Sequence, residues 1–493
     1  MNRKTVSGTM LTLLLIGILT SAFSIQPVKS EPTTWTVDDD GPADFPSIQE
    51  AIDSPLVVDG DIIYVHNGTY YEHLVVDKAV SLIGETRDST VIDGSKTDIV
   101  VRVRADYVTI TNFTIRNSRC SYADDSSIYI YGYSHNTVKG NMIAENFVSI
   151  YLNNAHSNII CNNEITAAFY WYTIWLRRSN HNVVEKNLIT NNRGSGISLW
   201  ASNWNTVNDN NVTGIPTLPT ANGVGIVLYA GSHSNVVSNN WLAYNRYSGL
   251  SLMQSEGNII QKNIMESNYL GIYSWQSSNN TIHRNIVSNN DWSVIFLSQS
   301  NENSIYHNNF LHNGIIIYSA YDNTWDDGYP SGGNYWSNYV DVDLYKGPNQ
   351  DILGSDGVWD HEYLINSRNQ DNYPLVEPWS VVPATVEIYP ETLSLHSLFG
   401  RWITAFIELP EGYNVSDVDI STVTLNDEVA AELHPTKVGD YDNDGISDLM
   451  VKFSRIDAMK SIFRTGENTL TISGETNRFS FEGSGTIRVN NPH

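Results

Sequence analysis

Cysteine is almost absent from this sequence, since its 493 residues include only two, Cys120 and Cys161. One disulfide is the most that these two could form. They fall on different units of an internal repeat and at different points within the unit, which is unfavourable for a bridge. We therefore expect two free, packed thiols and a stability that comes from the fold itself.

Basic residues are also few, because 28 Lys and Arg stand against 54 Asp and Glu, giving a formal net charge of −26. Nucleic acid and anionic membranes would be repelled by this charge. The composition argues against both partners, and it suits a secreted protein or one that takes up cations.

Long hydrophobic runs are absent beyond the N-terminus. Residues 1–30 have the pattern of an export signal, with Arg3 and Lys4, an apolar stretch over residues 10–19, and small or polar residues up to Ser30. The stretch is short for a membrane span, although an uncleaved anchor is the alternative. We expect a signal peptide, no membrane span after its cleavage, and a protein that is secreted or held at the cell surface.

Helix-forming runs of Ala, Glu, Lys and Leu are scarce too, and Asn, Ser, Tyr and Trp are abundant, which favours β structure. What recurs instead is asparagine at every fifth position, with Val or Ile two residues after the first asparagine and an apolar residue seven after it. Eight units of the form N-x-[VI]-x-x-N-x-φ-x-x-N begin at Asn136, Asn158, Asn182, Asn205, Asn235, Asn258, Asn280 and Asn303.

A repeat of 20 to 50 residues indicates a stacked architecture. The unit lacks the leucine consensus of leucine-rich repeats, is too short for a propeller blade, and shows no helical period. A coil of short parallel strands remains, with about three strands in each turn. Val184, Val207 and Val237 should then stack in one inner column, and the asparagines should form the bends, where they tolerate left-handed backbone and bond to one another in ladders.

The two ends of the chain beyond the repeats have their own patterns. Asp44–Asp53 has an amphipathic helical pattern and would cap the first turn of the coil, whose open edge invites aggregation. Val376–Thr385 is a proline-punctuated linker, and beyond it alternating apolar residues predict a small β-sandwich over residues 386–493.

The sharpest motif of this C-terminal domain is the sequence DYDNDGISD. Asp440, Asp442, Asp444 and Asp448, together with the carbonyl of Ile446, match ligand positions 1, 3, 5, 9 and 7 of a calcium loop. Position 12 is Val451 instead of glutamate, and the flanks have strand patterns. We expect a structural calcium site, and the alternative is a solvated acidic turn.

Aromatic residues recur at the end of the repeat unit. Trp200, Tyr229, Trp275 and Tyr318 are placed at nearly the same outward position after the last inner residue of their turns. Such rings could stack against the sugars of a polysaccharide or cell-surface glycan. The alternative is a ladder that merely covers the coil.

The opening WTVDDDGPADFPSIQEAI, the repeats, and the exit GGNYWSNY and DNYPLVEP together resemble the NosD-like right-handed parallel β-helix family. The resemblance implies an all-β, right-handed, single-stranded β-helix over residues 34–375. It also implies copper delivery, for which His135, His156 and His181 at successive repeat starts are the candidates. Because copper sites favour clustered His, Cys or Met ligands, we interpret these histidines as polar turn residues and expect no copper.

Catalysis finds little support in the sequence. Carboxylate pairs or a base beside a metal would be needed for cleavage of a polysaccharide. The charged candidates are scattered, and we assign no catalytic residue: Glu185, Lys186, Asp209, Lys262, Glu266 and Arg284. We therefore expect a non-catalytic glycan- or surface-binding module, with a polysaccharide lyase or hydrolase and a copper-delivery protein as the alternatives.

Overall fold

The computed structural model describes residues 32–119, 125–168, 172–214, 223–314, 317–394, 400–410, 412–426, 428–461, 465–476 and 479–490. The predicted signal peptide and Cys120 lie outside these ranges. Cys161 is a free, buried thiol, as predicted, and burial raises its pKa. None of the helices in the described ranges has the length and apolar character needed to cross a membrane.

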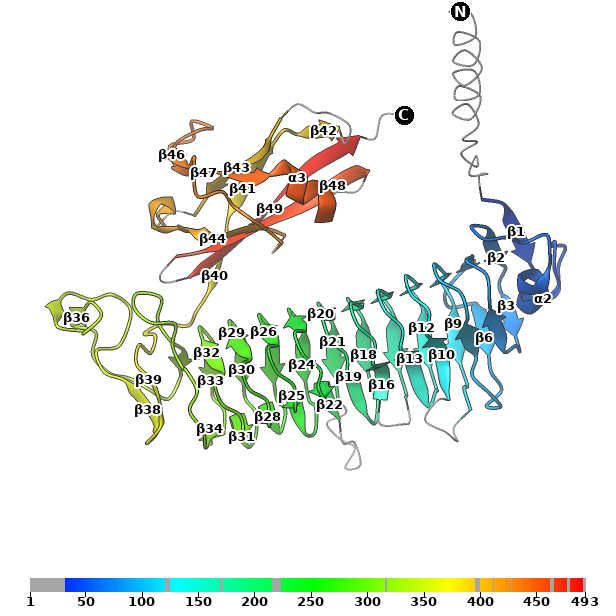
Figure 1. Ribbon diagram of the computed structural model, residues 1–493, viewed down its shortest axis with the longest axis horizontal. Coiled ribbons are helices and arrows are strands. Elements are labelled where there is room, and N and C mark those ends of the chain that lie inside the picture. Colours follow the sequence, from blue (N-terminus) through cyan, green and yellow to red (C-terminus); the bar gives the residue numbers. More distant parts are fainter. Residues whose placement is uncertain are drawn as a thin grey trace, which may run out of the picture.

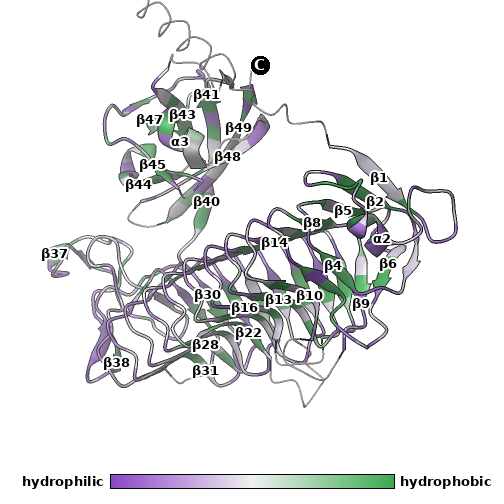
Figure 2. Ribbon diagram, turned by 45° about the vertical axis from the view of Figure 1, so that its right-hand side comes forward, coloured by the Kyte–Doolittle hydropathy of each residue, from purple (hydrophilic) through white to green (hydrophobic). Residues whose placement is uncertain are grey.

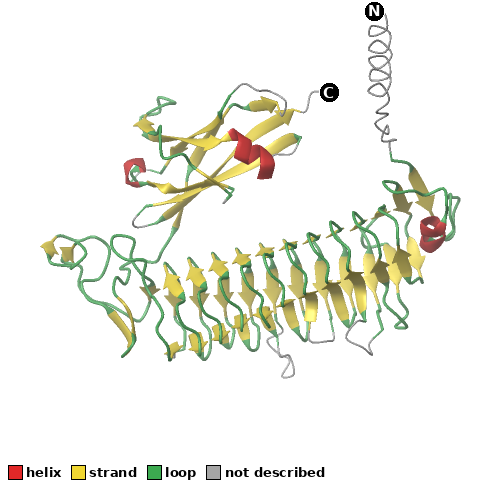
Figure 3. Ribbon diagram, viewed as in Figure 1, coloured by secondary structure: helices red, strands yellow, loops and turns green. Residues whose placement is uncertain are grey.

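The larger part of the chain is the predicted coil of parallel strands, seen as an elongated rod in Figure 1 and Figure 3. Three sheets run along the rod, and each turn contributes one strand to each sheet. Sheet A contains β1 (Thr34–Val37), β2 (Ile62–Val65), β5 (Ser81–Gly84), β8 (Thr109–Thr111), β11 (Thr137–Lys139), β14 (Ile159–Cys161), β17 (Val183–Glu185), β20 (Thr206–Asn208), β23 (Val236–Ser238), β26 (Ile259–Gln261), β29 (Thr281–His283) and β32 (Ser304–Tyr306).

The two other sheets have the same order along the rod. Sheet B contains β3 (Gly68–Tyr70), β6 (Thr90–Asp93), β9 (Thr114–Arg116), β12 (Met142–Ala144), β15 (Glu164–Thr166), β18 (Leu188–Thr190), β21 (Asn211–Thr213), β24 (Trp241–Ala243), β27 (Ile264–Glu266), β30 (Ile286–Ser288), β33 (Asn309–Leu311) and β35 (Tyr335–Trp336). Sheet C contains β4 (Leu74–Val76), β7 (Val101–Val103), β10 (Ser126–Tyr131), β13 (Val148–Asn153), β16 (Tyr172–Arg177), β19 (Ser195–Trp200), β22 (Val224–Tyr229), β25 (Ser248–Met253), β28 (Leu270–Trp275), β31 (Ser293–Ser298) and β34 (Ile317–Ser319).

The interior of the rod consists of stacked aliphatic columns. Val184 pairs in register with Val207, and Val207 with Val237, and all three are fully buried. Figure 2 shows hydrophobic residues concentrated in the strands and hydrophilic residues in the turns. The columns confirm the period read from the sequence, because only equivalent positions of successive turns can meet at the interstrand spacing of about 4.8 Å.

The asparagines form ladders, as predicted, but they do not adopt the left-handed conformation. In the ladder that contains Asn187, both its backbone N–H and its Nδ2 donate to Oδ1 of Asn210, at 3.1 and 2.9 Å. The left-handed residue is the one before each asparagine, for example Lys186 with φ 54° before Asn187 and His181 with φ 57° before Asn182. The asparagine side chain points inward to bond, and its outward-facing neighbour makes the bend, so the predicted bending role was wrong.

The rod has a cap at its first turn. Helix α2 (Ile48–Asp53) buries Ile48, Ala51 and Ile52 against the first strands, as the amphipathic pattern predicted. The side chain of Ser47 accepts a hydrogen bond from the backbone N–H of Glu50, which fixes the start of the helix.

The opposite end of the rod continues into irregular structure. It contains the short hairpins β36 (Tyr345–Lys346) with β37 (Ile352–Leu353), and β38 (Tyr363–Asn366) with β39 (Asn369–Asp371). Trp325 and Trp336, both buried, close the aliphatic core at this end. The chain then leaves the rod, and Trp379 is buried between the rod and the C-terminal domain.

Two small sheets packed around a common core form the C-terminal domain, in agreement with the predicted β-sandwich. A six-stranded mixed sheet contains β40 (Val381–Pro383), β42 (Thr392–Ser394), β44 (Asp419–Leu425), β45 (Val429–Ala430), β48 (Gly466–Glu475) and β49 (Ser480–Asn490). An antiparallel sheet contains β41 (Thr385–Tyr389), β43 (Trp402–Glu408), β46 (Lys437–Gly439) and β47 (Asp448–Ser454), and the helical segments are η1 (Val415–Asp417) and α3 (Arg455–Ser461).

Candidate functional site

The acidic motif is the connection between β46 and β47. Its carboxylates are oriented by the backbone of the loop itself: Asp440 accepts from the N–H of Gly445, and Asp448 accepts from the N–H of Tyr441 at 2.8 Å. Asn443 and Gly445 adopt left-handed backbone conformations, which allow the loop to turn tightly around these carboxylates. Ligand oxygens of Asp440, Asp442 and Asp448 lie within 4.8 Å of one another.

A fifth carboxylate, which sequence reasoning missed, belongs to the same cluster. Glu408 ends β43 and pairs in register with Asp448 of β47. Its carboxylate lies within 4.8 Å of those of Asp442 and Asp444. Partial burial raises the pKa of Glu408, and the neighbouring negative charges of Asp444, Asp442 and Asp448 raise it further.

These residues fit a hard divalent cation. Five carboxylates from two adjacent strands and their loop supply the oxygen ligands that calcium prefers, and their mutual repulsion would be relieved by an ion. Val451, at the position where a calcium loop has its glutamate, is fully buried in the core of the domain and cannot be a ligand. Glu408 would take its place from the neighbouring strand.

The aromatic residues lie on the outer face of sheet C, in two columns. The first column is Tyr129, Tyr151, Trp175, Ser198, Val227, Ser251, Tyr273, Phe296 and Tyr318. The second column is Tyr131, Asn153, Arg177, Trp200, Tyr229, Met253, Trp275 and Ser298. Trp200, Tyr229 and Trp275 therefore share one column, as predicted, but Tyr318 does not. It pairs with Phe296 in the first column, because the last strand is short and its turn differs from those before it.

Most of these rings cover one another. Tyr151 and Trp175 stack with centroids 4.3 Å apart and 7° between the planes, and Phe296 and Tyr318 stack at 4.5 Å. The guanidinium carbon of Arg177 lies 4.2 Å above the ring of Trp200. Trp275 makes no ring contact with any described residue, so no other ring covers its indole, whereas Tyr318 is the more exposed side chain at 42%.

The histidines proposed for copper do not form a ligand group among the described residues. His135 stacks on Tyr107 at 5.0 Å, and His181 stacks on Trp204 at 5.3 Å. Nδ1 of His156 accepts the backbone N–H of Asn180. Each imidazole is held by a residue of an adjacent turn of the coil.

Several of the scattered charged candidates have structural partners. Lys262 pairs with Glu482 at 3.3 Å and Arg284 pairs with Glu475, so both join the rod to the C-terminal domain. Glu266 accepts a hydrogen bond from Nε1 of Trp241 at 2.8 Å. The structure thus uses these side chains for docking and surface packing.

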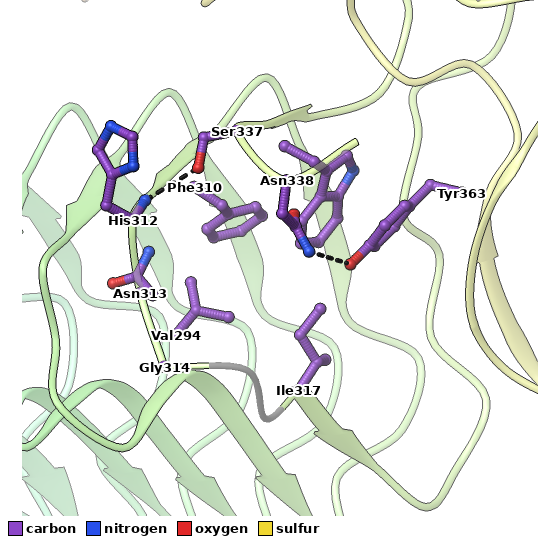
Figure 4. Close-up of a pocket in the computed structure, with 10 residues that line it drawn as sticks. Val294, Phe310, His312, Asn313, Gly314, Ile317, Ser337, Asn338 and Tyr363 are labelled. Carbon is purple, nitrogen blue, oxygen red and sulfur yellow. Dashed lines mark hydrogen bonds between the residues drawn. The ribbon is translucent and has the colours of Figure 1, made fainter. Parts of the chain in front are cut away.

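A cavity of about 170 Å³ lies near the end of the rod (Figure 4). Phe310, Trp336 and Tyr363 form its aromatic wall, and Nδ2 of Asn338 donates to the hydroxyl of Tyr363 at 3.3 Å. Ligand pockets usually reach roughly 300–1,000 Å³. The cavity is smaller than that, and we regard it as part of the packing of the end of the rod.

Comparison with known families agrees with this architecture. Residues 218–340 match the family described as periplasmic copper-binding protein (NosD), and residues 83–242 match the family described as right handed beta helix region. The coil is therefore a right-handed parallel β-helix, as the sequence resemblance implied.

Similarity to individual proteins is more limited. A cell surface glycoprotein of Methanothermus fervidus is 33% identical over 143 residues, which are 29% of this chain and 21% of that protein. The chain thus matches about a fifth of the length of this curated relative.

Solved structures with a similar fold include the A-module of a mannuronan C-5 epimerase from Azotobacter vinelandii (13% identity, 56% of this chain and 92% of that chain, TM-score 0.43). The catalytic domain of a GH87 alpha-1,3-glucanase is another (14% identity, 60% of this chain and 69% of that chain, TM-score 0.45). These likenesses concern the fold alone.

Proposed function

We propose that this chain, which has right-handed β-helix and NosD regions between residues 83 and 340, is an exported cell-surface protein that binds glycans without cleaving them. The binding surface would be the outer face of sheet C. The observation that supports this most directly is the concentration of partly exposed aromatic side chains in the two outward columns of that sheet. The name of the Methanothermus relative supports the location at the cell surface.

The physical basis of binding is apolar contact with a polar rim. Tyrosine and tryptophan offer flat apolar area together with O–H or N–H donors, which suits the mixed surface of a sugar. Strands spaced by about 4.8 Å hold these side chains on a rigid scaffold, so little ordering is needed when a ligand binds. Trp275, whose ring is not stacked, would be the principal contact.

A glycan array and titration with the full-length protein would test this function. Trp275→Ala should weaken binding about 2- to 10-fold, the equivalent of about 0.5–1.5 kcal/mol for one aromatic contact. Trp204→Ala is the matched control, because Trp204 is exposed at a corner outside sheet C. Absence of binding to any glycan would refute the proposal, and release of reducing or unsaturated products would replace it with an enzyme.

We also propose that the C-terminal domain binds calcium through Asp440, Asp442, Asp444, Asp448 and the carbonyl of Ile446, with Glu408 completing the site. Carboxylates on a hairpin loop and on the adjacent strand would be joined by the ion, so its role would be to stabilise the antiparallel sheet. A thermal shift on addition of calcium would test it.

A further inference from the structure

The charge of the rod is unevenly distributed over its three sheets. The eleven described strands of sheet C contain no aspartate or glutamate, and their only charged residues are Arg102 and Arg177. The strands of sheet B, in contrast, have Asp93, Glu164 and Glu266 beside Arg116, and those of sheet A have Lys139 and Glu185. In a chain with 54 acidic and 28 basic residues, a whole sheet whose strands carry arginine as their only charge is a distinctive surface.

Each of these arginines has a second arginine close to it in the chain. Arg104 follows β7, and Arg178 follows β16 directly. Strands β7 and β16 are separated in the sheet by β10 and β13. Three interstrand steps place the two arginine pairs about 14 Å apart along the rod. A single sugar ring cannot reach both pairs, whereas an oligosaccharide can.

The guanidinium groups are supported mainly by aromatic rings. Arg177 lies over Trp200 and donates from Nη1 to the hydroxyl of Tyr151 at 3.4 Å. Arg178 lies 5.8 Å from the ring of Trp200 and is exposed. Nε of Arg177 is buried, so the donors open to a ligand are those of its two Nη groups and of the exposed Arg178 guanidinium.

The pair formed by Arg102 and Arg104 has one weak ion-pair partner among the described residues, Asp98. Nη2 of Arg102 lies 3.9 Å from Oδ1 of Asp98, a long ion pair at the surface. Arg104 is exposed and forms no ion pair with a described residue, including Asp77, which follows the neighbouring strand β4. Exposed ion pairs contribute little, because water and salt screen them, so Asp98 leaves Arg102 available to a stronger partner.

The hollow between β7 and β10 gives this pair a defined site. Its volume is about 450 Å³, and its walls are Arg102, Arg104, Tyr129 and Tyr131 with Gly132 at the turn. This volume is in the range of roughly 300–1,000 Å³ that is usual for small-molecule sites. Tyr131 is 55% exposed, so its ring is accessible to a ligand in the hollow.

We propose that this arginine face, formed by Arg102, Arg104, Arg177 and Arg178 with the aromatic side chains between them, binds an anionic polysaccharide. Carboxylate or sulfate groups of the sugar chain pair with the two arginine pairs, and its rings contact Tyr129 and Tyr131. Planar guanidinium groups recognise both anions through paired hydrogen bonds. The inference rests on the proposed glycan binding and adds the charge class of the ligand.

The overall charge of −26 does not prevent such binding. At physiological ionic strength, charges more than about 8 Å away are largely screened, so the charges of the face itself determine the contact. Nucleic acid is less suited, because its closely spaced phosphates would mostly remain unpaired on a face with two arginine pairs about 14 Å apart.

Titration of the full-length protein with three oligosaccharides of matched length would test the inference: oligogalacturonate, a chondroitin sulfate oligosaccharide, and a neutral malto-oligosaccharide. We expect an anionic ligand to bind at least 10-fold more tightly than the neutral one, and monomeric galacturonic acid to bind far more weakly than its oligomer. The preference between the two anionic probes identifies carboxylate or sulfate as the partner. The double variant R102Q/R104Q and the double variant R177Q/R178Q should each remove most of the anionic preference.

Arg401→Gln is the matched control, since Arg401 lies 4.6 Å from the ring of Trp402 in the C-terminal domain and should not affect binding. Equal binding of neutral and anionic oligosaccharides would overturn the arginine inference and leave glycan binding intact. No binding of any glycan would overturn both. Tighter arginine-dependent binding of single-stranded DNA than of either anionic glycan would also refute the proposal.

Discussion

The imidazole of His307 lies flat against the indole of Trp379, with ring centroids 3.5 Å apart and 8° between the planes. This contact joins the last regular turns of the rod to the segment that enters the C-terminal domain. The backbone of Trp379 is held by the amide of Asn309 through two hydrogen bonds of 2.8 Å, and its Nε1 donates to the hydroxyl of Ser480. Trp379 thus connects the two parts of the molecule.

Burial of two histidines near this junction predicts loss of stability in acid. Burial and the positive charge of Arg284 lower the pKa of His307 and of His283 to about 3, from an ordinary value of 6.5. The unfolded chain therefore binds more protons between about pH 6.5 and pH 3, and the free energy of unfolding falls as the pH falls through this range. At about pH 5 each histidine would account for a loss of about 2 kcal/mol relative to neutral pH.

Urea unfolding at about pH 7.5 and about pH 5 would check this. His307→Gln should lose less stability on acidification than the wild type, whatever its stability at neutral pH. The exposed His434→Gln is the control and should behave as the wild type. Burial raises the pKa of Asp371 to about 7, so its protonation on acidification stabilises the folded protein. This contribution is the same in all three proteins and cancels in the comparison. An equal acid-induced loss in His307→Gln and wild type would show that this imidazole has the same pKa in the folded and in the unfolded chain.

Removal of one ladder asparagine should destabilise the rod strongly. In Asn210→Ala, the backbone N–H and Nδ2 of Asn187 lose their acceptor, and the carbonyl of Val184 loses its donor. Buried groups without a partner cost about 1–3 kcal/mol each, so we expect a loss of about 2–4 kcal/mol in urea unfolding.

The adjacent Asn211→Ala is the control for the ladder variant. Asn211 is half-exposed, and among the described residues its side chain accepts a hydrogen bond from Oγ1 of Thr213 alone. The Asn211→Ala substitution should lower the free energy of unfolding by less than about 1 kcal/mol. Equal losses in the two variants would mean that the ladder contributes nothing beyond the loss of an asparagine side chain.

The interior of the rod could be predicted from the sequence because its positions repeat. Val184, Val207 and Val237 occupy equivalent places, and the register of the sheets depends only on that equivalence. A second ladder, made of serines, could have been predicted in the same way, because serine stands three residues before many of the repeat starts. It was missed in the sequence analysis. Ser179 donates its backbone N–H to Oγ of Ser202, and Ser202 does the same to Ser232.

The features that could not be predicted arise where the repeat stops. Tyr318 lies in a different column from Trp275 because its turn no longer follows the consensus spacing. Glu408 joins the acidic loop only through the pairing of β43 with β47, which brings together residues 40 positions apart, and no local pattern specifies such a pairing. Docking of Trp379 similarly depends on the final packing of two separate cores.

Calcium should raise the melting temperature of the C-terminal domain, and Glu408 should matter as much as the loop residues. Calcium at a hundred times its dissociation constant would stabilise the folded domain by about 2.7 kcal/mol. Glu408→Gln and Asp448→Asn should each reduce the calcium-induced shift by at least half in a thermal unfolding experiment, compared with a sample containing chelator. Each removes one charge from a cluster of five.

Asp351→Asn, which removes an exposed charge outside this cluster, is the control for calcium. It should leave the calcium-induced shift unchanged. An unchanged melting temperature of the wild type in millimolar calcium would contradict the site. Loss of the shift in Asp448→Asn but not in Glu408→Gln would confine the ligands to the loop.

The end of the rod depends on one buried carboxyl group, that of Asp371. Its oxygens accept from the backbone N–H of Asn334 at 2.8 Å, from Nε1 of Trp336 at 2.9 Å and from the backbone N–H of Tyr373 at 3.2 Å. These bonds tie the GGNYW segment to the DNYP segment. Burial raises the pKa of Asp371 to about 7, although the three donors favour the charged form.

Replacement of Asp371 should therefore unfold this end of the rod more easily. Asp371→Leu leaves three buried N–H groups without an acceptor, and we expect a loss of at least about 3 kcal/mol, measured by urea unfolding with tryptophan fluorescence. Asp371→Asn keeps one acceptor oxygen for Asn334 and Trp336, so it should lose less. Asp322→Leu, at an exposed position with a long ion pair of 3.8 Å, should change stability by less than about 0.5 kcal/mol. If Asp371→Leu unfolded at the same urea concentration as Asp322→Leu, water would have to satisfy the three donors, and the carboxyl group would have no part in closing the rod.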